Sequence, residues 1–173
     1  MTKPQVGILM GSDSDLDVMS QTAKILDELG VAYEISVLST HRVPEETANY
    51  AKNAKEKGIK VLIAGAGGAA ALPGSLASMT TLPVIGVPVK SKLLAGLDSL
   101  LSIAQMPPGV PVATVGINGA KNAGILASEI IATSDQKVAR NLKDYKEKLK
   151  KEVLAKNSRL QKIGWEKYLG EKE

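Results

Sequence analysis

Cysteine is absent from this chain of 173 residues, and His41 is its only histidine. Without thiols there is no disulfide framework, no thiolate nucleophile and no site for a cysteine-bound zinc ion or iron–sulfur cluster. One imidazole is also too little for a histidine metal cage or for a second imidazole proton carrier. These absences exclude most thiol and metal chemistry.

Long hydrophobic runs are absent as well. The N-terminal run Val6–Met10 is too short for a signal-peptide core, and no run approaches the ~20 apolar residues of a membrane-spanning helix. The composition is otherwise ordinary, with 44% hydrophobic and 23% charged residues. Since a domain takes roughly 100–200 residues, we expect a soluble cytoplasmic protein with one globular domain and no membrane partner.

An excess of charge of one sign is confined to the C-terminal segment. The formal net charge is +4, but residues 134–173 hold 12 Lys and Arg against 7 Asp and Glu, whereas residues 1–133 hold 10 against 11. Aromatic residues make up only 3% of the chain. Because the charges are mixed in sign and aromatic residues are few, we interpret the tail as a solvated helix and expect no nucleic-acid partner.

Apolar runs of strand length alternate with helical patterns along the chain. The predicted strands are Val6–Met10, 32–38, 61–64, 83–89 and 112–117. The predicted helices start at a capping box of Ser14 and Asp17, at Pro44, after 68 with an interruption at Pro73 and Gly74, at Ser91, after Gly119, and at 135. This alternation is typical of βα units that build a parallel sheet covered on both faces.

Five right-handed βα units predict an α/β fold with three αβα layers, a doubly wound, flavodoxin-like parallel sheet of order 2-1-3-4-5. We expect residues 1–133 to form this catalytic domain and 134–173 to be its helical extension. Apolar residues at three- and four-residue steps indicate that the tail packs on a neighbouring subunit through Leu142, Tyr145 and Leu149.

Ligands of such sheets bind at the carboxyl ends of the strands, near the point where the strand order reverses. Gly11, Ser12, Ser14 and Asp15 follow the first strand at a helix start, where free N–H groups and hydroxyls favour a phosphate. For Ser14 alone, simple helix capping is the better interpretation. Asp15 repels phosphate, and its carboxylate suits ribose hydroxyls instead.

Ser39, His41 and Arg42 follow the second strand. An arginine binds phosphate or carboxylate with two parallel hydrogen bonds, and an imidazole gains and loses a proton near neutral pH. The position of His41 in a short loop at a strand end, beside an arginine, favours a functional histidine over a structural one.

Small residues follow the third strand. The segment 65–70 fits G-x-G-x-x-A, but it lies in the third βα unit, and no acidic residue ends a strand ~20 residues later. We therefore favour close approach of a ligand or a neighbouring subunit to Gly65, Gly67 and Gly68, with Ala71 and Leu72 beside them. An NADP-binding oxidoreductase is a remote alternative. Polar residues at Ser91 and 98–102 are interpreted as caps and solvated positions.

Six segments in unbroken order resemble the class I N5-carboxyaminoimidazole ribonucleotide mutase (PurE) family. They are GSDSD, THRVP, AGAGGAA-LPG, LPVIGVPV, GLDSLLSIAQMP-GVPVAT and NAGILA, within residues 5–132. The resemblance implies a flavodoxin-like subunit in a homo-octamer, with neither metal nor organic cofactor. It also implies a small-molecule ribonucleotide substrate of purine biosynthesis, whose carboxylate moves from the exocyclic nitrogen to carbon 4 of the imidazole.

The family's functional residues carry over to matching positions of this chain. Its substrate-binding serine and aspartate match Ser12 and Asp15, and its histidine–arginine pair matches His41 and Arg42. The resemblance thus agrees with the chemistry of these residues. Our hypothesis is that His41 protonates the exocyclic nitrogen, carbon dioxide is released and trapped, and His41 then removes the proton from carbon 4.

The chain departs from the family pattern at several positions. A second active-site histidine is replaced by Ala71, a threonine by Val43 and a methionine by Ser75, and the segment 115–121 is shorter than usual. We expect Ala71 to lower activity without preventing folding. Two further alternatives are a carboxylase that takes aminoimidazole ribonucleotide and free carbon dioxide, and a catalytically weakened ribonucleotide-binding relative.

Overall fold

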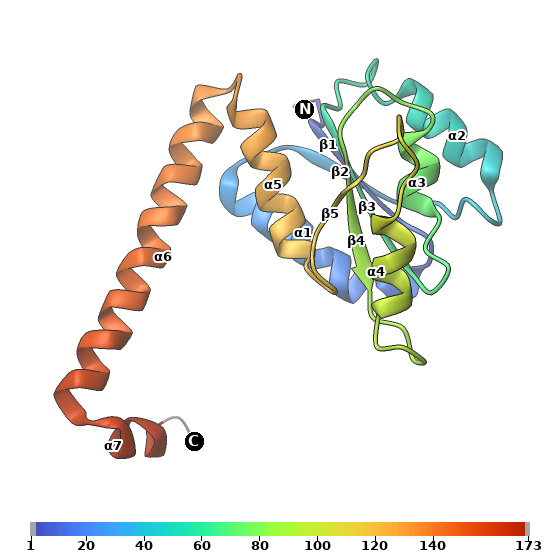
Figure 1. Cartoon of the computed structure of the whole chain (residues 1–173). Helices are drawn as coiled ribbons and strands as arrows, with labels where there is room; N and C mark the ends of the chain where they lie inside the picture. Colours follow the sequence, from blue (N-terminus) through green and yellow to red (C-terminus); the bar gives the residue numbers. More distant parts are fainter. Residues whose placement is uncertain (1–2, 172–173) are drawn as a thin grey trace.

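The structure, a computed structural model, describes residues 3–171 and has a parallel sheet between two layers of helices (Figure 1). The strands are β1 (Val6–Met10), β2 (Tyr33–Val37), β3 (Val61–Gly67), β4 (Val84–Val89) and β5 (Ala113–Thr114). The helices are η1 (Asp13–Asp15), α1 (Leu16–Leu29), α2 (Pro44–Asn53), α3 (Leu72–Ala77), α4 (Leu97–Ala104), α5 (Ala120–Ala132), α6 (Gln136–Ile163) and α7 (Trp165–Gly170). All strand pairs are parallel in the order β2-β1-β3-β4-β5, so the predicted fold class and strand order are confirmed.

The two faces of the sheet have separate apolar cores. Alternate residues of a strand point to opposite faces, so Ile8 and Ile63 pack toward α1 and α5 while Leu9 and Leu62 pack toward α2, α3 and α4. Strands β1 and β4 are buried along their full length. Burial on both faces explains why these segments are continuous apolar runs. The parallel direction of the strands places their carboxyl ends together at one edge.

The edge strand β5 is shorter than predicted and ends at Thr114, although the N–H groups of Val115 and Asn118 still donate to the Gly86 and Pro88 carbonyls of β4 at 3.1 and 2.8 Å. Gly119 donates its N–H to the Gly116 carbonyl at 2.8 Å, and Asn118 adopts a positive φ of 56°. This turn replaces the end of the strand expected over 112–117.

The start of α1 corrects the predicted capping box. The Ser12 side chain, not that of Ser14, accepts a backbone hydrogen bond: the Ser14 N–H donates to Ser12 Oγ at 3.3 Å and opens the short helix η1. The prediction was wrong because it did not include a 3₁₀ turn before α1.

Two other predicted helices differ from the structure. Helix α4 begins at Leu97 rather than at Ser91, because Ala95 and Gly96 have φ values of 51° and 96°, which an α-helix does not accommodate. Helix α3 is not interrupted at Pro73, because proline is tolerated in the first helical turn, where its missing N–H has no intrahelical acceptor.

Helix α6 buries one face of its first half and leaves its second half exposed. Val138, Leu142 and Tyr145 are buried in the same apolar core as α1 and α5, so the prediction that Leu142 and Tyr145 pack on a neighbouring subunit is wrong. Leu149, in contrast, is 41% exposed. We call residues 136–148 the root and residues 149–171 the arm, which points away from the sheet and ends with α7 folded back (Figure 1).

Among residues 3–171, none of the helices combines the length and the apolar character needed to cross a membrane.

Candidate active site

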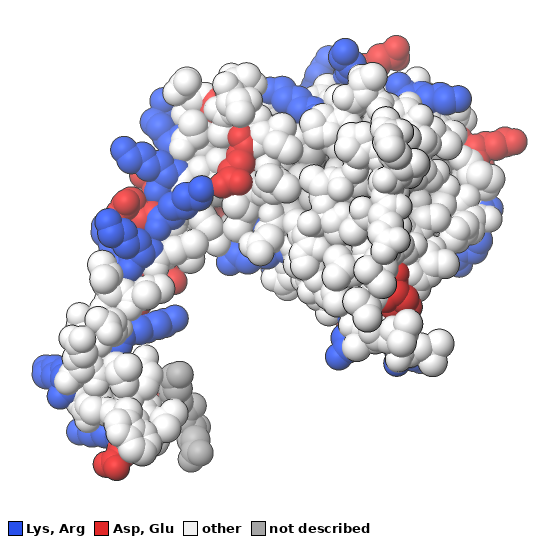
Figure 2. Space-filling view, in the orientation of Figure 1, with Lys and Arg blue, Asp and Glu red and all other residues white. Residues whose placement is uncertain are grey.

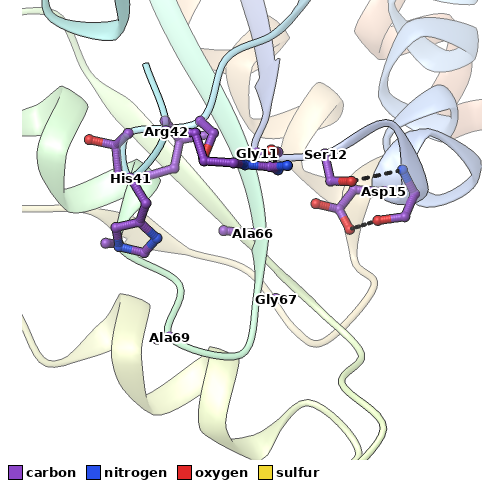
Figure 3. Close-up of a pocket in the computed structure, with 13 residues that line it drawn as sticks. Gly11, Ser12, Asp15, His41, Arg42, Ala66, Gly67 and Ala69 are labelled. Carbon is purple, nitrogen blue, oxygen red and sulfur yellow. Dashed lines mark hydrogen bonds between the residues drawn. The ribbon is translucent and has the colours of Figure 1, made fainter. Parts of the chain in front are cut away.

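A pocket of about 520 Å³ lies at the carboxyl ends of β1, β2 and β3 (Figure 3). Its lining comes from three strand-to-helix connections: Gly11, Ser12, Ser14, Asp15, Ser39, Thr40, His41, Arg42, Ala66, Gly67, Ala69, Ala71 and Leu72. The parallel order β2-β1-β3 brings these connections together, because each leaves the sheet at the same edge.

The turn after β1 supplies the hydroxyls and a carboxylate. Ser12 and Ser14 both reach the pocket, and the Ser14 hydroxyl donates to Asp15 Oδ1 at 3.5 Å. Burial raises the pKa of the Asp15 carboxyl above its ordinary value, an effect that the Ser14 hydrogen bond opposes and the nearby Asp13 charge reinforces. Asp15 therefore combines a partly desolvated carboxylate with access to a ligand.

His41 lies on the opposite side of the pocket from Asp15, with Ala66 and Gly67 between them (Figure 3). It belongs to a tight turn that the Val43 N–H closes by donating to the Ser39 carbonyl at 2.8 Å. The imidazole is exposed at the pocket surface rather than directed into the interior. This position leaves the ring accessible to a bound ligand.

Arg42 fastens the histidine turn to the end of β1. Its Nη2 donates to the Gly11 carbonyl at 2.7 Å, and its Nε lies 3.4 Å from the Ser39 Oγ that accepts from it. A guanidinium has five N–H donors, so these two bonds leave donors available for an anion in the pocket. Arg42 therefore both holds the turn and offers a positive charge.

Small residues form the wall between the two polar sides. Gly67, Ala69 and Ala71 are exposed at the pocket, but Gly65 and Gly68 do not line it. A side chain at Gly65 would overlap the buried Met19, and the Gly68 N–H donates to Ser99 Oγ at 2.9 Å. Gly65 therefore serves close packing and Gly68 a turn with a φ of 64°, whereas their neighbours Ala66, Gly67 and Ala69 line the pocket.

Residues 3–171 contain no cluster of three or more His, Asp or Glu side chains suited to hold a metal ion.

The family model described as AIR carboxylase matches residues 5–152. The chain belongs to the AIR carboxylase family. It is 62% identical to the N5-carboxyaminoimidazole ribonucleotide mutase of Thermotoga maritima, over 98% of this chain and 99% of that protein. It is 59% identical to the mutase of the same name from Pyrococcus horikoshii, over 98% and 96% of the two chains.

This chain is also similar to a solved structure. The crystal structure of Treponema denticola PurE superposes with a TM-score of 0.83 at 31% identity, covering 91% of this chain and 98% of that one. The family match over residues 5–152 includes the three connections that line the pocket.

Most residues singled out in the sequence lie in this pocket, and three of its lining residues were missed. Thr40, Ala66 and Ala69 line it without a chemical signal of their own, although each neighbours a residue in a predicted segment. Ser99, interpreted as a cap or a solvated position, is fully buried, and its hydroxyl donates to the Val89 carbonyl at 2.8 Å. The position of Thr40, Ala66 and Ala69 near the ends of strands could have indicated that they line the pocket. The contacts of Ser99 could not be predicted, because they depend on the fold.

Proposed function

We propose that this chain is an N5-carboxyaminoimidazole ribonucleotide mutase, an isomerase of purine biosynthesis. The observation that carries the proposal is the 62% identity to the T. maritima mutase over nearly the full length of both proteins. The enzyme moves the carboxylate of its ribonucleotide substrate from the exocyclic nitrogen to carbon 4 of the imidazole ring.

His41 is the proton carrier in this proposal. Its protonated ring donates a proton to the exocyclic nitrogen as the bond from nitrogen to the carboxylate breaks, and the electron pair stays on nitrogen as carbon dioxide leaves. Carbon 4 of the aminoimidazole then attacks carbon dioxide, and the neutral ring takes the proton from carbon 4. The imidazole returns to its starting protonation state, so one histidine balances the reaction.

The polar side of the pocket binds the rest of the nucleotide. The Ser12 hydroxyl suits the phosphate, and Arg42 adds the positive charge. Asp15 accepts hydrogen bonds from the ribose hydroxyls. Asp15 and His41 lie on opposite sides of the pocket (Figure 3). The base of the nucleotide therefore lies between these two residues, against the wall of small residues.

The apolar wall retains carbon dioxide between the two steps. Ala66, Gly67, Ala69 and Ala71 offer no side-chain hydrogen-bond partner to a released carbon dioxide or to water. Because His41 and Ala71 are exposed in a single chain, bound substrate or a neighbouring subunit must complete the enclosure.

We also infer that the chain forms a homo-octamer, as the family resemblance implies. Support comes from apolar side chains exposed in the turn before α4, on α4 and after β5: Leu94, Leu97, Leu101 and Ile117. The face over α4 and β5 carries few charges (Figure 2). Burial of such a patch stabilises association by roughly 25 cal/mol per Å² of apolar surface.

Light scattering after size exclusion tests the assembly. We expect the unaltered chain to elute as an octamer and the double variant Leu97→Glu/Leu101→Glu to elute as a smaller species with unchanged circular dichroism. A monomeric unaltered chain would refute the inference.

The decisive experiment for the function is an assay of carboxylate migration, followed by NMR with a ¹³C-labelled carboxylate. We expect His41→Asn to lower kcat by about 10²–10⁴-fold, because a positioned general acid–base contributes that much. Nucleotide binding measured by calorimetry should persist in the variant. Loss of less than about ten-fold would remove His41 from the proton-transfer role.

The family description favours one second candidate, a carboxylase that takes aminoimidazole ribonucleotide and free carbon dioxide. Added bicarbonate separates the two activities. A mutase converts its carboxylated substrate at a rate independent of bicarbonate, whereas the carboxylase rate rises with bicarbonate.

We propose that Ala71 stands where the family has a second active-site histidine, as the resemblance implies, and that it limits the rate. Ala71 lines the pocket immediately before α3, so a histidine there would face the space that the substrate occupies. We expect Ala71→His to raise turnover with little change in thermal stability. No gain in turnover would show that the missing ring does not limit catalysis.

A further inference from the structure

One hydrogen bond joins the histidine turn to an element far away in the sequence. Thr40 Oγ1 lies 2.7 Å from Ser75 Oγ, and the pair is partly buried. That separation is the usual length of a strong hydroxyl–hydroxyl hydrogen bond. Thr40 immediately precedes His41, and Ser75 lies on α3, so the bond connects the turn after β2 to the helix after β3.

Ser75 is held firmly on its own side. Helix α3 buries Leu72 and Leu76, with 3% and 0% of their surfaces exposed, in the core beneath the sheet. The Ser75 N–H donates to the Ala71 carbonyl at 3.0 Å, which ties the serine to the helical turn that starts at the pocket wall. The Ser75 hydroxyl is therefore a fixed point beside the pocket.

The histidine turn is thus fastened on both sides of His41. Thr40 is bonded to α3, and Arg42 is bonded to the Gly11 carbonyl at the end of β1. The two fastenings lead to different elements, so together they restrict rotation of the turn as well as its displacement. This restriction matters because a shift of about 1 Å in a reacting group costs on the order of 10²-fold in rate.

We propose that the Thr40–Ser75 hydroxyl pair is a positioning element that sets the orientation of the His41 imidazole for proton transfer. Ser75 does not line the pocket, so it acts through Thr40 and the turn rather than on the substrate. The inference rests on the proposed function for its kinetic consequence, but the orientation of the ring is measurable without any turnover.

NMR gives a direct view of that orientation, because His41 is the only histidine and its Hε1 resonance needs no assignment. We expect Ser75→Ala and Thr40→Val each to shift or broaden this resonance in the free protein at one fixed pH. Each variant should lower kcat by about 2- to 10-fold, the worth of one hydrogen bond, with KM changed by less than about two-fold.

Three further variants separate positioning from a general loss of structure. Ser75→Thr keeps the hydroxyl and should restore both the resonance and kcat. The double variant Thr40→Val/Ser75→Ala should resemble either single variant, because both remove the same bond. Ser78→Ala is the matched control: its hydroxyl donates to the Ser75 carbonyl at 2.8 Å, and its loss should leave His41 unchanged.

The proposal fails if the His41 resonance of Ser75→Ala and Thr40→Val equals that of the unaltered chain, or if Ser78→Ala moves it equally. It also fails if the resonance moves while kcat stays constant in an active enzyme. A chain without migration activity that still shows the resonance changes would refute the mutase proposal and leave the positioning of the ring established.

Discussion

Apolar residues are buried in the body of the molecule (residues 3–148, which include the root) and exposed in the arm (residues 149–171). In the body, strands and helices bury their apolar side chains in two cores on the faces of the sheet. In the arm, Val153, Leu154 and Trp165 are 63%, 54% and 66% exposed. Helix α6 belongs to both regions, since its root buries one face in the core and the rest of the helix lies in the exposed arm.

The difference shows that helix formation and burial are separate properties of this segment. Asp135 caps α6 by accepting from the N–H groups of Lys137 and Val138 at 3.0 and 3.2 Å, and Gly164 ends the helix. These local signals suffice to define the helix. The exposed apolar side chains of the arm are a surface that this chain by itself does not bury.

Matched leucine substitutions on α6 give the largest effect. We expect Leu142→Ala, in the root, to lower the free energy of unfolding by about 2–5 kcal/mol, because it empties a packed site. Leu154→Ala, in the arm, should cost less than about 0.5 kcal/mol within a subunit. Urea denaturation at several protein concentrations distinguishes the sites: the Leu142 effect stays constant, and any Leu154 effect grows with concentration. Equal and constant losses would contradict the division into root and arm.

Substitutions of one glycine in the body and one in the arm compare how closely the two regions are packed. A methyl group at Gly65 would overlap the Met19 side chain, whereas no other side chain of residues 3–171 lies within 4 Å of one at Gly170 in the arm. We expect Gly65→Ala to lower the free energy of unfolding by about 1–3 kcal/mol through overpacking. Gly170→Ala should leave the unfolding midpoint unchanged. A Gly65→Ala protein as stable as the unaltered chain would show that Met19 moves aside freely.

Two aspartates extend the comparison to charge. Burial in the pocket raises the pKa of Asp15 above 3.8, and the hydrogen bonds from the Val138 and Lys137 N–H groups lower the pKa of Asp135 below 3.8. Carboxyl ¹³C NMR titration should therefore find the Asp15 midpoint above that of Asp135. The reverse order would contradict at least one of the two shifts.

The signs of their contributions to stability are opposite. The depressed pKa of Asp135 gives stability that is present above the pKa of the unfolded chain and is lost as the pH falls through the folded value. The raised pKa of Asp15 favours the protonated folded form, so this residue opposes folding once it is ionised in both states. Asp135→Asn and Asp15→Asn should change the acid limb of the stability profile in opposite directions.

The ion pair between α1 and the root of α6 gives the smallest effect. Lys148 Nζ lies 2.9 Å from Glu28 Oε1, but their side chains are 62% and 41% exposed. Water and salt screen such a pair, and holding two long side chains costs entropy. We expect Lys148→Met to have an unfolding midpoint indistinguishable from that of the unaltered chain in 0.15 M salt. A clear drop that high salt abolishes would assign the pair a larger role.

Much of the fold and most of the pocket were predictable from local pattern. The segment Val6–Met10 matches the predicted strand residue by residue, and the polar turns after β1 and β2 lie at the strand ends where ligands were expected. These predictions succeed because strand periodicity and the rule for parallel sheets depend only on neighbours in sequence. The start of α4 was not predictable, since the positive φ at Ala95 has no composition signal.

What the sequence by itself determined is the set of five βα units and the three polar or glycine-rich turns, because hydrophobic spacing and turn chemistry act over a few residues. Only the tertiary structure decided that Gly65 faces Met19 rather than the pocket, that Leu142 is buried while Leu154 is exposed, and that Thr40 meets Ser75. These features depend on residues that are far apart in the chain, and a local sequence pattern contains no information about which distant residues meet.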